Sequence, residues 1–421
     1  MNKWLANNRR FVYTAILFFT LLFCLIFFRT YYQQELGGDL VDYWHHAGRI
    51  ASSPGYLLHS PEFGQLEPLH NIIIGILRIL PGDDRISLGI AQSLLFALVL
   101  ILLYKMSLHF GGDVLALLVV CWTMTSYRFY SYIWNPARDI WVFYGIILLY
   151  YFSLRYFFNG RLRDHLIFCL CCGLLVLTDM RYIMHIALVA LLYLFFTRNS
   201  LKAKIRDLLL LVFIPLLIIT PWIIRQKSVF GEWMFISRFR MELFTKVFAD
   251  REDYQHTLHY QAEQRTLEKS GQRLLDRVEE DSLTREVYDR LMSKDAYYKT
   301  HPLPGRLVRL GAFWKFCNFR HFLLPLSNRK SVSDPWSWQH NLEGIIHIGL
   351  LIPLFIAGVY FSFKLKKWYL VMFLVMLAGH TILHAFTYVQ ERYRLIIVPY
   401  YFLLAFWGLL QFIKRMEKKR T

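Results

Sequence analysis

Long apolar runs alternate with short polar segments along most of the chain. A helix needs about 20 apolar residues to cross a bilayer, so runs of this length predict transmembrane helices. We count ten such runs, some of them short or interrupted by a polar residue, at residues 11–28, 88–108, 114–130, 139–158, 165–179, 181–197, 207–224, 344–363, 368–387 and 395–413. The first run is too long for a signal peptide and no small-residue cleavage site follows it, so we expect a retained anchor.

The composition agrees with this pattern, since 56% of the 421 residues are hydrophobic and the mean hydropathy is +0.34. The predicted fold class is an all-α polytopic membrane protein with about ten transmembrane helices and amphipathic helices in its external loops. We divide the chain into an N-terminal transmembrane module (1–224), a large and mostly helical external region (225–343), and a C-terminal transmembrane module (344–421).

Basic residues predict the orientation of the chain. Cytoplasmic loops carry an excess of Lys and Arg, and with ten spans all the basic segments fall on one side. These segments are the N-terminus and residues 159–164, 197–207, 364–367 and 414–420. We therefore expect both termini in the cytoplasm and a location in the cell (inner) membrane. This distribution explains much of the net charge of +18 without a nucleic-acid partner. Five of the six cysteines lie in apolar runs, without disulfide or metal-ligand spacing.

Two external segments are long, residues 29–87 and 225–343. In the first, a polar face with helical spacing begins at Asp39 and is followed by a turn at residues 52–56. Residues 67–84 predict a second short helix, which Pro68 opens. In the second segment, the spacing of apolar residues predicts a polar helix over 281–291 and an amphipathic helix on the lipid surface over 301–326.

Acidic residues at the outer ends of the spans are candidates for catalysis. No glycine-rich phosphate loop follows a strand, so the donor of an enzyme of this kind would be carried by a lipid. Asp39 would stand at the depth of a lipid phosphate, where a carboxylate can act as general base on a hydroxyl; the alternative is a helix cap. Asp139 could share a metal with Asp39 or orient the acceptor; the alternative is a local pair with Arg138.

Arginines at the outer ends of the spans are candidates for binding phosphate. Arg392 and Arg394 precede the last span and Arg225 follows the seventh, against the positive-inside bias. The forked donors of arginine match a phosphate group. The alternative for the first two is a pair with Glu391. A polar hinge at 177–185 contains Asp179 and Arg181, for which a simple pair is the alternative.

The order of these features resembles the GT-C superfamily of membrane glycosyltransferases, in particular the family 39-like group of protein O-mannosyltransferases and aminoarabinose transferases. The resemblance extends over about residues 30–410. It rests on Asp39, Tyr43 and Ala47 as an Asp-x-x-x-Tyr-x-x-x-Ala pattern, on "EPLHNIIIGIL" (67–77), "NPARD" (135–139) and "PWIIRQKSVFG" (221–231), and on "RYRLIIVPYYFLL" (392–404).

The resemblance implies catalytic roles for Asp39, which activates the acceptor, and for Asp139 as a second external acid. Relatives carry a lysine beside the acid at position 67 that contacts the lipid phosphate. Here Pro68 follows instead, and Arg49, His70, Arg392 and Arg394 are the candidate replacements. The substrate-binding candidates are Asp42, Tyr43, Glu67, His70, Arg138, Arg225, Arg392 and Arg394.

The implied reaction moves a sugar from a polyprenyl-phosphate donor to a hydroxyl of a glycan, lipid or protein on the extracytoplasmic side, with inversion. No cofactor is certain, and a divalent metal cation stays open. Two alternatives remain. O-antigen ligases and polymerases also have one large external loop, but an acid directly after the first span is not typical of them. A transporter of lipid-linked sugars should show internal repeats, and the sequence shows none.

Overall fold

The computed structural model describes residues 2–32, 36, 39–60, 62–65, 67–79, 84–196, 200–231, 233, 235, 314, 338–386 and 391–420. Every element of regular secondary structure within these ranges is a helix, which confirms the predicted all-α class. The helices expected over 281–291 and 301–326 lie outside the described residues, apart from the single residue 314. The same holds for most of the region 225–343.

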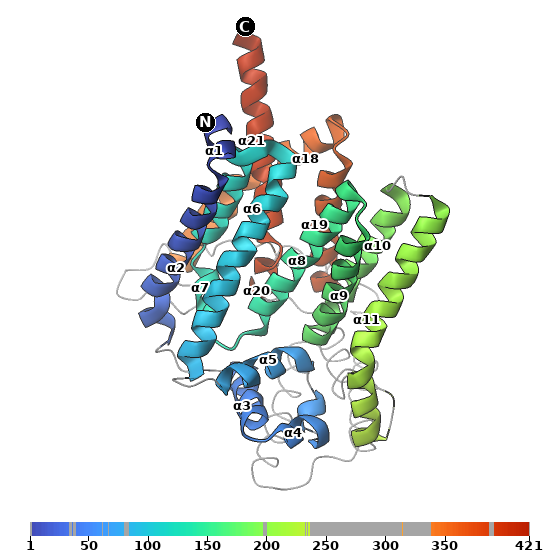
Figure 1. Ribbon diagram of the computed structural model, residues 1–421. Coiled ribbons are helices and arrows are strands. Elements are labelled where there is room, and N and C mark those ends of the chain that lie inside the picture. Colours follow the sequence, from blue (N-terminus) through green and yellow to red (C-terminus); the bar gives the residue numbers. More distant parts are fainter. Residues whose placement is uncertain are drawn as a thin grey trace, which may run out of the picture.

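The described helices form a bundle with a group of short helices at one end (Figure 1). In chain order they are α1 (Asn2–Asn7), α2 (Arg9–Tyr32), α3 (Asp39–Ser52), α4 (Pro54–His59), η1 (Glu62–Gln65), α5 (Pro68–Arg78), α6 (Asp84–Met124), α7 (Arg128–Ile133), α8 (Arg138–Asn159), α9 (Leu162–Thr178), η2 (Met180–Tyr182), α10 (Ile183–Phe196), α11 (Leu201–Phe230), α17 (Trp338–His347), η5 (Gly349–Leu351), α18 (Ile352–Lys364), α19 (Trp368–Phe386), α20 (Glu391–Leu395) and α21 (Val398–Arg420).

The apolar runs of the sequence all fall on helices, but the number of ten spans is not established. By length and composition, five described helices can cross a membrane: Arg9–Tyr32, Arg85–Met124, Arg138–Asn159, Leu201–Phe230 and Asn341–Lys364. Two further apolar helices, Met180–Leu191 and Tyr369–His384, are shorter. The chain is thus a polytopic membrane protein, and its exact number of crossings stays a prediction.

The helix α6 contains a sharp turn at Gly112, whose backbone has φ +76° and ψ −167°. This conformation is open to glycine and strained for other residues. Arg85 lies over the ring of Tyr32 at one end of α2, whereas Asp113 pairs with Arg9 at the other end. The segment therefore runs up to Gly112 and then turns back. The predicted run 88–108 and most of the run 114–130 therefore form two arms of α6, which this turn joins.

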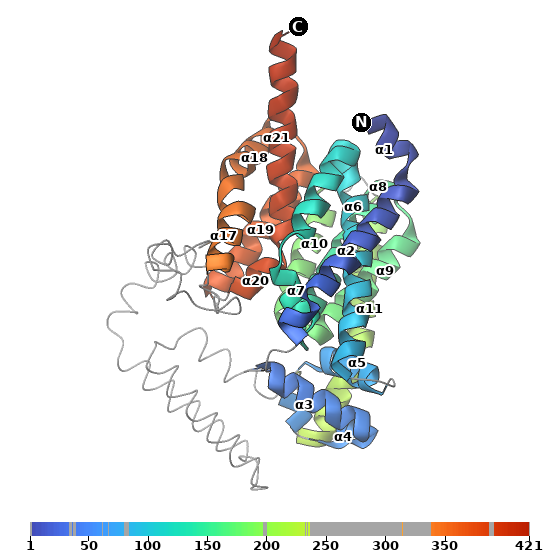
Figure 2. The same cartoon turned by 90° about the vertical axis from the view of Figure 1, so that its left-hand side faces the viewer.

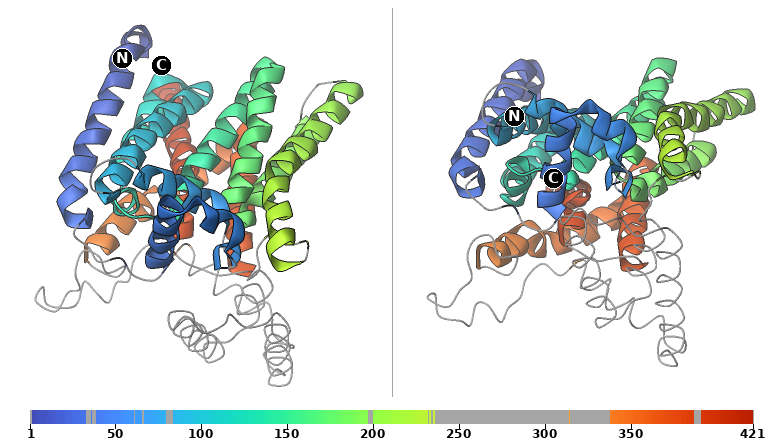
Figure 3. Two further views of the ribbon diagram at one scale, coloured as in Figure 1. Left: turned by 60° about the horizontal axis from the view of Figure 1, so that its bottom comes forward. Right: turned by 90° about the horizontal axis from the view of Figure 1, so that it is seen from below.

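The two ends of the bundle differ in charge. Both termini lie at one end, together with the α8–α9 and α18–α19 connections, the last residues of α10 and the first residues of α11 (Figures 1 and 2). These are the segments that the sequence marks as basic, so their expected location on one side of the molecule agrees with the fold. The short helices α3–α5 lie across the opposite end (Figure 3).

The C-terminal helices pack closely on each other and are tied to the rest of the bundle. Gly358 on α18 and Gly408 on α21 face each other, and a Cβ atom at either position would lie within 2.2 Å of a backbone oxygen on the other helix. Small residues allow this close approach, as in other membrane helix pairs. Arg128 of α7 pairs with Glu343 of α17, with 2.6 Å between Nε and Oε2. This buried ion pair joins α7 to α17.

Helices α3 and α5 form an amphipathic pair that packs onto the bundle. Ile74 and Gly75 of α5 are buried, and the site of a Cβ at Gly75 lies 2.9 Å from Ile50 of α3. Arg78 donates to the Trp44 carbonyl at 2.7 Å and lies over the Trp44 ring. The same buried face of α5 carries polar residues in its first turn, and these lead into the site.

Candidate active site

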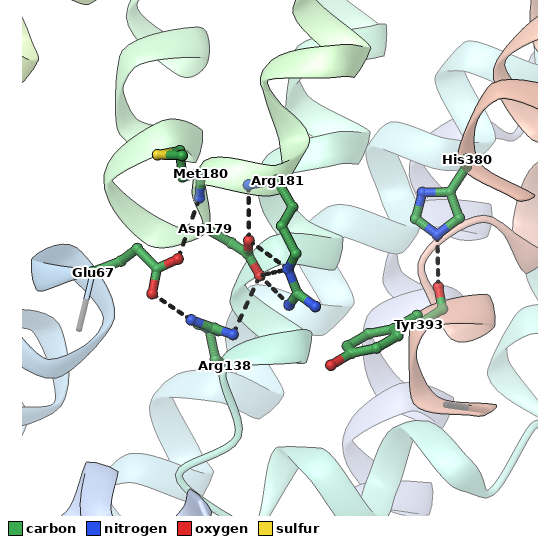
Figure 4. Close-up of polar contacts among 7 residues, drawn as sticks. All are labelled: Glu67, Arg138, Asp179, Met180, Arg181, His380 and Tyr393. Atoms are coloured by element: carbon green, nitrogen blue, oxygen red, sulfur yellow. Dashed lines mark hydrogen bonds and ion pairs between the residues drawn. The ribbon is translucent and has the colours of Figure 1, made fainter. Parts of the chain in front are cut away.

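A network of two acids and two arginines lies where α5, α8 and the α9–η2 junction meet (Figure 4). Arg138 Nη1 donates to Glu67 Oε2 at 2.5 Å, and its Nη2 lies 3.4 Å from Asp179 Oδ2. Arg181 binds the same Asp179 carboxylate through Nε at 2.9 Å and Nη2 at 2.5 Å. Arg138 thus bridges two carboxylates that are 112 positions apart in the sequence.

Local structure explains how each side chain arrives there. Pro68 occupies the first turn of α5 and leaves Glu67 as an extended residue before the helix. Arg138 is the first residue of α8, after Pro136 ends the preceding turn. Asp179 caps the end of α9 with extended backbone, and its carboxylate accepts from the backbone N–H of Arg181 at 3.1 Å. Each charged group therefore lies at the end of a helix.

The two carboxylates differ in their electrostatic environment. Burial opposes the charge of both, but Asp179 has two arginine partners whereas Glu67 shares only one. Arg138 and Arg181 consequently hold the pKa of Asp179 below its usual range. Burial raises the pKa of Glu67 despite the contact with Arg138, and the nearby charge of Asp179 adds to the effect. Two interacting acids whose pKa values separate in this way are common at functional sites.

These opposite shifts predict opposite dependences of stability on pH. The lowered pKa of Asp179 means that its contribution is present above about pH 4 and is lost as the pH falls further. The raised pKa of Glu67 means that its contribution is present below about pH 4 and declines as the pH rises. We therefore expect Asp179→Asn to flatten the acid side of a plot of unfolding midpoint against pH. Glu67→Gln should flatten the same plot between about pH 4 and neutral pH. The same effect from both variants would contradict the opposite pKa shifts assigned to Asp179 and Glu67.

Aromatic and imidazole side chains extend the network on both sides. Tyr43 of α3 packs against His70 of α5 with ring centroids 4.8 Å apart, and the Arg138 guanidinium lies 5.8 Å from the Tyr43 ring. On the other side, Arg181 lies 4.5 Å from the Tyr393 ring. His380 Nε2 donates to the Tyr393 carbonyl at 3.0 Å, as Figure 4 shows. The site thus contacts α3, α5, α8, η2 and α20.

Several predicted site residues belong to this arrangement, and others lie apart from it. Glu67, His70, Tyr43 and Arg138 come together as described. Asp139 is buried and close enough to Tyr182 to influence it electrostatically. Asp39 is the first residue of α3, one helical turn before Tyr43, but its side chain is outside the described part. Half-buried Asp42 lies on the same helix.

The three predicted external arginines have different surroundings. Arg225 donates to the Leu57 carbonyl at 3.1 Å and also to the Ser60 carbonyl, so it ties α11 to the end of α4. Arg394 is buried on α20, and the side chain of Arg392 is not described. A role of these three residues in binding substrate stays a prediction.

Sequence reasoning missed part of the site. It treated Asp179 and Arg181 as a local pair, which is present, but did not connect that pair to Glu67 and Arg138. It also missed a buried imidazole contact, in which His185 Nε2 and His380 Nδ1 are 3.0 Å apart. The available signal was a set of ionisable residues between two apolar runs, since such residues are costly in a membrane and usually have a function.

The metal prediction has little support among the described side chains. No group of three His, Cys, Asp or Glu residues within them is arranged to hold a metal ion. Whether the chain uses a divalent cation stays open.

Comparisons with known proteins found a matching family model and a similar solved structure. Residues 61–224 match the family model for dolichyl-phosphate-mannose-protein mannosyltransferases. A solved structure of the archaeal oligosaccharyltransferase AglB from Archaeoglobus fulgidus, in complex with an inhibitory peptide and a dolichol-phosphate, superposes with a TM-score of 0.55 at 12% identity. The match covers 98% of this chain and 51% of AglB. The chain has the fold of the GT-C membrane glycosyltransferases. No curated protein matches the chain in sequence.

The GT-C fold confirms the resemblance seen in the sequence, and the family match supports the predicted glycosyltransferase class. The matched range includes Glu67, Arg138, Asp179 and Arg181, but not Asp39. This chain spans about half the length of AglB.

Proposed function

We propose that the chain is an integral membrane glycosyltransferase. It transfers a sugar from a polyprenyl-phosphate donor to an acceptor hydroxyl on the extracytoplasmic side, with inversion at the anomeric carbon. The family match and the GT-C fold support this class of reaction. One observation carries the proposal. Ion pairs hold Arg138 and Arg181 at one end of the bundle, and α3, which begins at Asp39, lies across that same end.

The two arginines are suited to bind the phosphate of the donor. Their side chains are 16% and 24% exposed, so they are largely desolvated and still reachable. Arg181 uses Nε and Nη2 for Asp179, which leaves the donors on Nη1 for a ligand. Glu67 and Asp179 hold both guanidinium groups in place without a ligand. Preorganised cations of this kind stabilise the charge that develops on a leaving phosphate.

The reaction is a direct displacement. Asp39 takes the proton of the acceptor hydroxyl as general base. The acceptor oxygen forms a bond to the anomeric carbon from the face opposite the phosphate. The bond between that carbon and the phosphate oxygen breaks, and its electron pair leaves with the polyprenyl phosphate. Arg138 and Arg181 stabilise the added negative charge. Asp139, buried one residue after Arg138, is the second candidate catalytic acid beside Asp39.

The charges at the two ends support the proposed side of the membrane. The end that carries the basic connections is assigned to the cytoplasm, because cytoplasmic loops are rich in Lys and Arg. The helices α3–α5 and the ion network are then extracytoplasmic. The lipid head group of the donor would rest at this interface, and a glycan, lipid or protein hydroxyl would approach from outside.

The proposal is tested by following transfer with the purified chain in lipid nanodiscs. Dolichyl-phosphate-mannose and dolichyl-phosphate-glucose serve as donors, with peptide and glycan alcohols as acceptors. We expect release of dolichyl phosphate that depends on the acceptor, and a glycoside whose anomeric configuration is opposite to that of the donor. A product with retained configuration contradicts direct displacement. No release above that of protein-free nanodiscs contradicts the proposed function.

A further inference from the structure

The first turns of α5 carry two polar side chains that the ion network does not use. His70 and Asn71 are both fully buried, with 0% exposure. Neither ring nitrogen of His70 has a hydrogen-bond partner, and neither the oxygen nor the nitrogen of the Asn71 amide has one. A buried polar group without a partner costs stability, and native proteins usually avoid it. Two adjacent residues with four such atoms therefore need an explanation.

These side chains lie on the face of α5 that points toward the ion network. Glu67, His70, Asn71 and Ile74 follow the spacing of one helical face. Glu67 binds Arg138 directly, and His70 is close enough for the charge of Arg138 to act on it. Tyr43 contacts both the His70 ring and the Arg138 guanidinium. The uncharged pair is therefore adjacent to the arginine that we assign to the donor phosphate.

The chemistry of the pair favours a neutral ligand with hydroxyl groups. Burial, together with the charge of Arg138, keeps the pKa of His70 well below its ordinary value, so the ring is neutral near pH 7. A neutral imidazole offers one donor and one acceptor, and a carboxamide offers two donors and an acceptor. Neither of these two side chains carries a positive charge for an anion, whereas sugar hydroxyls can both donate and accept.

We propose that His70 and Asn71 form the subsite that binds hydroxyl groups of the donor sugar, next to the phosphate held by Arg138. This inference rests on the proposed function. The sugar reaches His70 by displacing the Tyr43 ring that covers it, and its hydroxyls then satisfy the four polar atoms. Selectivity for the sugar, as distinct from affinity for the lipid phosphate, would depend on these two residues.

The test compares a lipid phosphate that carries the sugar with the same lipid phosphate without it. Binding of dolichyl-phosphate-mannose and of dolichyl phosphate is measured for the full chain in nanodiscs. We expect the wild type to prefer the mannosylated lipid at least tenfold. The Asn71→Leu variant, which keeps the side-chain volume and removes the polar atoms, should prefer it less than threefold. Affinity for dolichyl phosphate should not change. The unfolding midpoint of ligand-free Asn71→Leu should equal or exceed that of the wild type.

A matched control separates this effect from a general change in packing. Ser107 of α6 is also fully buried with an unpartnered hydroxyl, but it lies toward the basic end, near Tyr104 and its bond to Asp113. Ser107→Ala should leave the preference for the mannosylated lipid unchanged. His70→Leu serves as a second variant and should reduce the preference as Asn71→Leu does.

The outcomes separate this inference from the proposed function. If Asn71→Leu and His70→Leu both prefer the mannosylated lipid as strongly as the wild type does, the subsite is overturned, even if the wild type transfers sugar. A wild type that transfers sugar but binds both lipids equally also overturns it. A wild type that neither prefers a sugar-bearing lipid nor transfers sugar overturns the proposed function together with the subsite.

Discussion

Replacing Arg138 by alanine is expected to abolish measurable transfer and to lower the free energy of unfolding by about 3–5 kcal/mol, the usual cost of breaking a buried ion pair. The side chain bridges Glu67 and Asp179, with N–O distances of 2.5 and 3.4 Å. Its removal leaves Glu67 buried without a cation and leaves Asp179 with Arg181 alone. Transfer assays and denaturant unfolding in mixed micelles measure the two effects.

The control for this prediction is an ion pair at the other end of the molecule. Arg9 lies 3.2 Å from Asp113, but its side chain is 46% exposed. Exposed pairs contribute about 0–1 kcal/mol, so Arg9→Ala should be nearly as stable as the wild type and should retain transfer. Arg138→Lys keeps the charge but has no fork to reach both carboxylates, and should recover little activity. Equal loss of stability in Arg9→Ala and Arg138→Ala would contradict the importance of the network.

The helices could be predicted because lipid imposes a simple rule on the sequence. Backbone groups in a bilayer must bond within the segment, so long apolar runs become helices. The turn at Gly112 falls in the gap between two predicted runs, 88–108 and 114–130. The short helix α4 was missed, because Pro54 and Gly55 in "SSPGY" indicate the end of a helix as well as the start of another.

The candidate site could be predicted only in part, because its contacts join distant segments. Arg138 was weighed as a partner of Asp139, its neighbour in sequence. Adjacent residues on a helix point in different directions, and Arg138 instead reaches Glu67 and Asp179. The pair of Asp179 and Arg181 was anticipated because a carboxylate and a guanidinium two residues apart can meet across one turn.

Beyond the ion pairs, the sequence named buried Tyr43 and His70 as candidates, but the contacts of the other buried residues could not be found from local patterns. His185 and His380 are 195 positions apart and meet because α10 packs beside α19. The polar atoms of His70 and Asn71 look like an ordinary interruption of an amphipathic helix until their lack of partners is seen. Which groups face one another depends on helix packing, and a single sequence contains no direct record of it.

Replacing Asp39 by asparagine is expected to reduce turnover by about 10²–10⁴-fold, the usual contribution of a general base. The amide cannot take a proton from the acceptor, but it has nearly the same shape. The ion network and the polar face of α5 do not include residue 39, so binding of the donor should be unchanged. Asp42→Asn is the matched control, because Asp42 lies on the same helix less than one turn away. Asp42 is itself a candidate for binding substrate, so its effect is expected on KM. Turnover at saturation should stay within about threefold of the wild type, since this variant removes no proton acceptor from the reaction.

The most direct measurement is the rate at which wild-type chain and Asp39→Asn release dolichyl phosphate, each saturated with donor and acceptor, alongside the affinity of each for the donor. The account predicts equal affinities and a rate at least a hundredfold lower for Asp39→Asn. Equal rates in the two proteins, or a loss that follows weaker binding of the donor, would contradict the role of Asp39 as the catalytic base.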